Sequence, residues 1–132
     1  EQGMVGEDLG GREAIARLNM VSAYEGYVVW NSSEATKYYA FDVDTTYRAV
    51  MRASDQLKLE ATVIKSAPKE GYSLETKGDV PMHIDILPLE KSVTTVVISI
   101  PTFGDKDYVE LFYKLVDDNL PPKAAVGKEK IQ

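Results

Sequence analysis

The chain has 132 residues, with 15 Lys and Arg residues against 21 Asp and Glu residues, and therefore a formal net charge of −6. This length suits one domain with a hydrophobic core, and 44% hydrophobic residues is too many for a disordered protein. The acidic balance argues against binding to nucleic acid or anionic lipid, which favour a basic surface. Because there are no cysteines, a disulfide framework, a thiolate metal site and a cysteine nucleophile are excluded.

We expect three regions along the chain. Residues 1–22 are glycine-rich at their start and are expected to form a flexible arm with a short helix at residues 12–22. Residues 23–121 are expected to form a single α+β domain, and residues 122–132 a disordered tail. No run approaches the roughly 20 apolar residues of a membrane-spanning helix, and no signal-peptide pattern is present. The chain begins with Glu rather than Met, so we expect a processed or trimmed product.

The domain opens with two predicted strands. Residues 24–30 (YEGYVVW) are aromatic and β-branched, which favours a strand, and residues 31–33 (NSS) are typical of a turn. A second strand is predicted over residues 34–42. Its alternation places Tyr39 and Phe41 on one face.

A helix is predicted next, from Asp44 to about Lys58. Asp44 suits the N-cap position because its carboxylate can accept hydrogen bonds from the free N–H groups of the first turn. This role also explains the D-x-D pair of Asp42 and Asp44 better than a calcium site does. The buried stripe is predicted from three- and four-residue spacing to contain Tyr47, Val50, Met51, Ser54 and Leu57.

Four alternating segments follow, at residues 59–64, 72–77, 82–87 and 93–100, and predict four strands. The turns between them are too short for crossovers, so consecutive strands must pair antiparallel. The last segment, VTTVVISI, is the richest in β-branched residues and is expected to be a central strand.

A second helix is predicted to begin after TFGD, with Asp105 as its N-cap. Its apolar stripe contains Tyr108, Leu111, Phe112, Leu115 and Val116. Asp117 and Asp118 fall near its C-terminal end, where the helix dipole disfavours acids, and only solvent exposure accounts for them.

These elements predict a two-layer α+β sandwich: a mostly antiparallel sheet of about four to five strands, with two amphipathic helices on one face. The other face of the sheet is expected to meet water through a polar set of residues. That set contains Ser73, Glu75, Lys77, His83 and Asp85.

Two groups of residues are candidates for function. His83 and Asp85 lie two apart on a strand and so share a face, which suits a general base or a weak metal site, but a solvated polar face explains them more simply. An aromatic group gathers around the first two strands and could form a partner surface if exposed, or fill the core if not. Its members are Tyr24, Tyr27, Trp30, Tyr38 and Tyr39.

Three passages carry a resemblance: EATKYYAFDVDTTYRAVMRASDQLKLE, the paired strands ending in VTTVVISI, and TFGDKDYVELFYKLVDDNL. They resemble a family of small bacterial lipoproteins of unknown function, over about residues 27–120. The resemblance implies export and membrane anchoring. Because this chain lacks cysteine, the lipid anchor would lie upstream of Glu1, with the N-terminal arm as a tether. The resemblance supplies no catalytic residues.

The leading hypothesis is a non-enzymatic, exported envelope protein, periplasmic or associated with the outer membrane, that binds another envelope component. An open sheet edge could accept a partner strand, and the acidic charge favours a basic partner. The alternative is a small-molecule-binding module with a pocket between sheet and helices, lined by Tyr47, Met51 and Phe112. An enzyme built on His83 and Asp85, a homodimer joined sheet to sheet and a cytoplasmic location stay open. No cofactor or metal is expected.

Overall fold

The computed structural model describes residues 27–67, 69–101 and 105–122. Within them the chain is α+β, as predicted. The elements run in the order β1 (Val29–Asn31), β2 (Glu34–Tyr39), α2 (Val43–Gln56), β3 (Glu60–Ala67), β4 (Gly71–Lys77), β5 (His83–Glu90), β6 (Val93–Ser99) and α3 (Lys106–Asp118). The arm and helix predicted for residues 1–22, most of the predicted tail and residues 102–104 of the TFGD turn lie outside the described residues.

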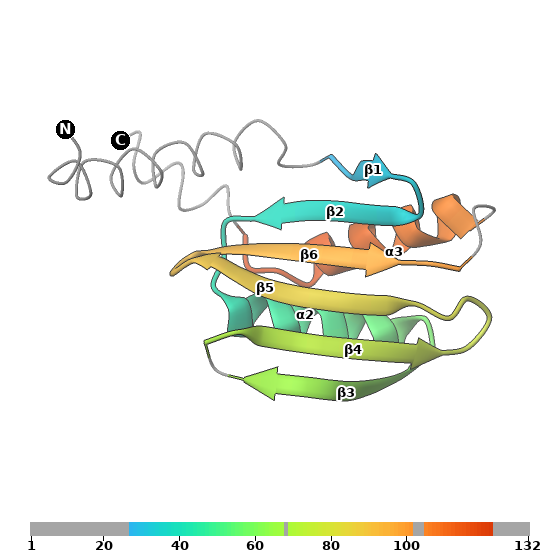
Figure 1. Ribbon diagram of the computed structural model, residues 1–132, viewed down its shortest axis with the longest axis horizontal. Helices are drawn as coiled ribbons and strands as arrows, with labels where there is room; N and C mark the ends of the chain where they lie inside the picture. The colour runs from blue at the N-terminus through green and yellow to red at the C-terminus, as the bar shows by residue number, and fades with distance from the viewer. Residues whose placement is uncertain (1–26, 68, 102–104, 123–132) are drawn as a thin grey trace, which may run out of the picture.

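All strands join one antiparallel sheet, in the order β1-β2-β6-β5-β4-β3 (Figure 1). The expectation of about four to five strands is wrong, because the described residues form a sheet of six. Hairpin β1–β2 extends the sheet, since β2 pairs with β6 along its whole length, from Glu34 opposite Ser99 to Tyr39 opposite Thr94. Strand β6 therefore has a neighbour on each side, which confirms its predicted central position.

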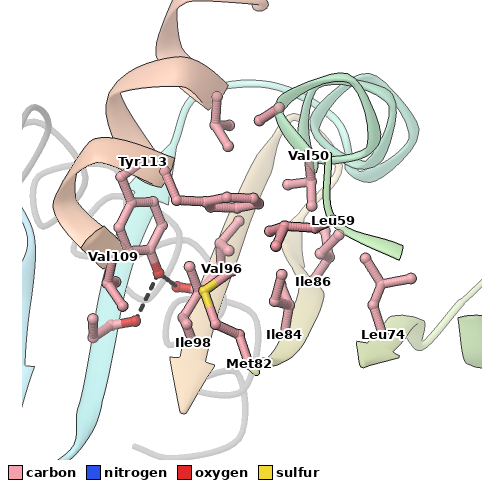
Figure 2. Close-up of a cluster of buried hydrophobic side chains, with 14 of the residues drawn as sticks. Val50, Leu59, Leu74, Met82, Ile84, Ile86, Val96, Ile98, Val109 and Tyr113 are labelled. Atoms are coloured by element: carbon pink, nitrogen blue, oxygen red, sulfur yellow. Dashed lines mark hydrogen bonds between the residues drawn. The ribbon is translucent and has the colours of Figure 1, made fainter. Parts of the chain in front are cut away.

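Both helices cover the same face of the sheet (Figure 1). Strand alternation sends one set of apolar side chains under the helices, where they form the core (Figure 2). The strands contribute fully buried side chains from Ala35, Leu74, Ile84, Ile86, Val96 and Ile98. The helices close the core with Val50, Val109, Phe112, Tyr113 and Val116.

The start of α2 differs from the prediction. Asp42, rather than Asp44, occupies the N-cap, and its side chain makes no capping hydrogen bond. Instead, the amide and the hydroxyl of Thr46 both donate to the main-chain oxygen of Asp42, at 3.1 and 2.9 Å. Asp44 lies in the first turn, where an acid favours the positive end of the helix. At α3, Asp105 holds the N-cap position as predicted, again without a side-chain bond.

The buried faces of both helices are rotated slightly from the predicted stripes. In α2 the buried residues are mostly small, which lets the helix lie close to the sheet: Thr46, Ala49, Val50, Ala53 and Ser54. The larger predicted residues, Tyr47, Met51 and Leu57, are only partly buried and flank this contact. In α3, the predicted stripe contains Leu111, which is 44% exposed, whereas Val109 and Tyr113, which are not in that stripe, are buried.

Candidate functional site

The sheet face away from the helices carries the polar set predicted for it. Ser73 lies opposite Asp85 and Glu75 lies opposite His83, so these four side chains form two adjacent rows across β4 and β5. All four are at least partly exposed, whereas the alternate residues Leu74 and Ile84 are fully buried. The prediction of a polar face open to water is confirmed.

The structure brings His83 and Asp85 into contact. His83 Nε2 lies 3.1 Å from Asp85 Oδ1, and its Nδ1 lies 3.6 Å from Glu75 Oε2. Ser73 donates its hydroxyl to the same Asp85 oxygen, at 2.6 Å. A hydrolytic triad needs the imidazole between the hydroxyl and the carboxylate, so that it can take the hydroxyl proton. Here the carboxylate lies in the middle, so this arrangement does not activate Ser73 as a nucleophile.

A cleft of about 460 Å³ lies next to His83, at the end of the sheet where β5 begins and β6 ends. Its lining combines the His83 imidazole and the Glu75 carboxylate with apolar surface from Met82 and Ile100. No group of three or more His, Cys, Asp or Glu residues in the described ranges is arranged to hold a metal ion. The cleft therefore offers polar contacts to a ligand without a metal site among these residues.

The predicted aromatic group is divided between different surroundings. Tyr24 lies outside the described residues, and Tyr27 is 65% exposed. Trp30 is partly buried against the core, and Tyr39 is only 4% exposed within it. Tyr38 lies on the opposite, open face of β2, because neighbouring residues of a strand point to opposite faces. The described members do not share one surface.

The three residues proposed to line a pocket between sheet and helices also lie apart from the described clefts. Phe112 is fully buried in the core. Tyr47 stacks on Tyr72, with ring centroids 4.0 Å apart and an angle of 13° between the rings. The Tyr72 hydroxyl donates to Asp44 at 2.7 Å. Met51 packs against the edge of the core.

Strand β3 is an open edge of the sheet (Figure 1). Thr76 of β4 donates its amide N–H to Met82, on the β5 side, at 2.9 Å. Main-chain directions alternate along an antiparallel ladder. Ala61, opposite Thr76, and Val63, opposite Leu74, therefore turn their N–H and C=O groups away from β4.

The side chains of β3 are also accessible. Val63 is 38% exposed and Ile64 is 51% exposed. The pairing with β4 shifts between Val63 and Lys65, which marks a bulge, and Lys65 forms an exposed ion pair with Glu70 at 3.0 Å. A bulge and a lysine are common protections of an edge against indiscriminate pairing. The edge is thus accessible, but the bulge and Lys65 at its centre disfavour indiscriminate strand pairing.

Sequence reasoning missed Lys37, a buried cation on the core side of β2. Lys37 is 4% exposed, and its Nζ lies 2.5 Å from Oδ2 of Asp117 on α3. Its Nζ also lies 5.5 Å and 5.9 Å from the ring centroids of Tyr39 and Tyr113. The sequence did indicate a buried position for Lys37, since Ala35, Lys37 and Tyr39 are two residues apart and so point to the same face of the strand. This contact also explains the acid at the end of α3.

Two buried tyrosines, Tyr39 and Tyr113, lie beside this ion pair. The Tyr113 hydroxyl contacts two main-chain oxygens, Ala35 at 2.6 Å and Val96 at 2.9 Å (Figure 2). The Tyr39 hydroxyl is buried and has no hydrogen-bond partner among the described residues. Burial, and secondly the nearby Asp117 carboxylate, raise the pKa of Tyr39 well above its ordinary value. Burial likewise raises the pKa of Tyr113.

Comparisons with known proteins place the chain in a family. A family model described as a protein of unknown function, DUF3568, matches residues 12–119. A search among curated proteins finds no match. None of the helices in the described residues is long and apolar enough to cross a membrane. Since the family model matches well over half of the sequence, the chain belongs to the DUF3568 family, whose function is unknown.

Proposed function

We propose that this protein is a non-enzymatic, partner-binding domain of the bacterial cell envelope. In this proposal the β3 edge receives an extended segment of an envelope protein as an added strand. The observation that carries it is the outward main chain of Ala61 and Val63 on an accessible edge. The resemblance to exported lipoproteins supports the location, with a lipid anchor upstream of Glu1.

The edge offers both parts of such an interaction. Strand β3 is eight residues long, which is enough for several main-chain hydrogen bonds to a partner strand. The exposed side chains of Val63 and Ile64 supply apolar contact at its middle. The net charge of −6 favours a basic segment, because opposite charges steer association.

The test of strand addition uses two substitutions at one position. Ala61→Pro removes an N–H group that points outward, so it blocks a partner strand but leaves the ladder to β4 intact. Ala61→Val is the matched control, since it keeps the N–H group. A photo-cross-linking residue in place of Ile64 reports contact in living cells of the native host.

We expect a cross-linked product of discrete mass in the unsubstituted protein and in Ala61→Val, and its loss in Ala61→Pro. Thermal unfolding of the purified variants shows whether each one folds. If a folded Ala61→Pro protein gives the same cross-linked product, strand addition at β3 is wrong. If Ile64 gives no discrete product, the edge is not the partner site.

The location has a separate test on the full-length gene product in its native cell. We expect it in the membrane fraction, and we expect its precursor to accumulate when lipoprotein processing is blocked. Recovery in the cytoplasm with no precursor would contradict the envelope assignment. That result would leave the β3 contact to be judged by cross-linking.

A further inference from the structure

A second cleft lies at the opposite end of the sheet from β3, between the segment leading into β1, strand β2 and helix α3. Its volume is about 430 Å³, within the usual range for small-molecule sites. Lys37 and Asp117 line it, together with Glu110 and Lys114 of α3. The ion pair of the buried lysine is therefore part of the wall of a cleft.

Lys37 retains hydrogen-bonding capacity at this wall. An ammonium group carries three N–H donors, and that of Lys37 makes one hydrogen bond, to Asp117, among the described residues. Its side chain is only 5% exposed, so bulk water does not surround the other two donors. A buried donor left without an acceptor is destabilising. An oxygen-bearing ligand in the cleft would supply the missing acceptors, and a carboxylate brings two oxygens.

The charges of the lining argue against a simple anion. The lining contains two ammonium groups, from Lys37 and Lys114, and two carboxylates, from Glu110 and Asp117, so its formal charges balance. An anion would meet both carboxylates and a chain of net charge −6. A zwitterion matches the lining better, because its carboxylate can face the lysines and its ammonium group the acids.

The rest of the lining favours an apolar side chain on the ligand. Tyr27 lines the cleft and is 65% exposed, so much of this residue is available for contact. Val28 adds an aliphatic surface beside it. An exposed aromatic ring can also attract an ammonium group through its π face.

We propose that this cleft binds a free α-amino acid with an aromatic or large aliphatic side chain. The carboxylate of the amino acid accepts hydrogen bonds from Lys37 and Lys114. Its ammonium group lies against Glu110, and its side chain lies against Tyr27 and Val28. The site shares no residue with the β3 edge, so it is independent of strand addition.

The test is calorimetric titration of the full chain with L-phenylalanine as the probe. Two analogues separate its charges: 3-phenylpropanoate lacks the ammonium group, and 2-phenylethylamine lacks the carboxylate. We expect saturable binding of phenylalanine at one site, and binding of each analogue at least about tenfold weaker, because each loses a charge-assisted contact. Equal binding of phenylalanine and either analogue would overturn the proposal, as would no binding at millimolar phenylalanine.

Variants locate the site. Lys37→Met removes the buried donors, and Lys114→Met is a second variant on the helix surface, where loss of folding is not expected. Lys91→Met, in the turn between β5 and β6, is the matched control. We expect about tenfold weaker phenylalanine binding for Lys114→Met and unchanged binding for Lys91→Met. If Lys114→Met binds phenylalanine as tightly as the unsubstituted protein does, the site does not lie in this cleft.

Discussion

Lys37 is the residue with the least ordinary surroundings in the described chain. A lysine is rarely this deeply buried unless it is paired, and its partner Asp117 lies on a helix 80 residues away in sequence. The two partners differ in exposure, since the Lys37 side chain is 5% exposed and that of Asp117 is 40% exposed. Removing Lys37 should therefore change the free energy of unfolding by a different amount from removing Asp117.

This difference gives a prediction about stability. Asp117→Asn leaves a buried ammonium group without a counter-charge and should lower the free energy of unfolding by about 2–3 kcal/mol. Lys37→Met leaves a carboxylate that reaches water and fills the same space with an apolar chain, so it should cost less than about 1 kcal/mol. Urea unfolding of both variants at neutral pH measures the two values. A larger loss for Lys37→Met would contradict the assignment of the cost to the buried charge.

The burial of Lys37 could be predicted from the sequence, but its ion pair with Asp117 could not. The alternation of β2 places Lys37 with Ala35 and Tyr39, so its face could be read from the sequence. Its partner could not, because pairing a strand with an acid 80 residues later requires the docking of α3. The sequence therefore predicts only an exposed acid at Asp117. The contact of His83 with Asp85 was within reach, since both lie on one face of one strand.

Among the secondary-structure elements, the β3–β4 hairpin has the tightest backbone constraint. Gly71, the first residue of β4, has a φ of +93°, and a Cβ atom there would lie 2.0 Å from the main-chain oxygen of Ile86. The main chain of the neighbouring strand β5 thus occupies the space that a side chain at residue 71 would need. A main-chain atom in a ladder cannot move aside as the end of a side chain can.

We therefore predict that Gly71→Ala lowers the free energy of unfolding by about 2–4 kcal/mol. Gly78→Ala is the comparison: its φ is +155°, and its Cβ would meet the Leu59 side-chain end at 2.6 Å. Because that side chain can rotate, the expected cost is about 1 kcal/mol. Thermal unfolding of the two variants compares them. A milder effect at Gly71 than at Gly78 would mean that β5 yields easily at this point.

Helix positions were predictable, but their orientation was less so. Periodicity located both α2 and α3, yet the predicted stripes favoured large residues such as Tyr47 and Leu111. The actual contact of α2 uses Ala49 and Ala53, which have little hydrophobic surface and so little weight in a pattern. A rotation of about one residue changes which side chains reach the sheet, and only the close fit between the layers decides it.

For the whole molecule, the two buried tyrosines link stability to alkaline pH. In the unfolded chain tyrosine loses its proton near pH 10, whereas burial raises the pKa of Tyr39 and Tyr113 in the folded protein. Above about pH 10 the folded state therefore holds more protons than the unfolded state. Stability that is fully present below that pH is lost as the pH rises toward the folded-state pKa values.

The expected slope is about 1.4 kcal/mol per pH unit for each tyrosine, or roughly 2.7 for both. Urea unfolding between about pH 9 and pH 11.5 measures it. Tyr39→Phe removes one of the two buried tyrosines and should lower the slope by about 1.4 kcal/mol per pH unit, with Tyr38→Phe on the open face as the control. An unchanged slope in Tyr39→Phe would show that this buried hydroxyl does not contribute.

The α+β architecture and the antiparallel hairpins followed from short turns and alternation, and the central place of β6 from its composition. The number of strands in the sheet did not. The pairing of β2 with β6 brings together residues far apart in the sequence, such as Lys37 and Val96, and no local sequence pattern predicts such a contact.

That same pairing gives the protein an order of assembly. Strands β3 to β6 form a meander in which each strand pairs with the one before it, so these contacts close short loops. Hairpin β1–β2 is synthesised before β6 but can pair with it only after more than fifty intervening residues. Because long loops cost more entropy to close, the meander should fold early and β2 should dock late. The cleft lined by Lys37 and Asp117, which needs β2 and α3 together, would then be completed in the last step of folding.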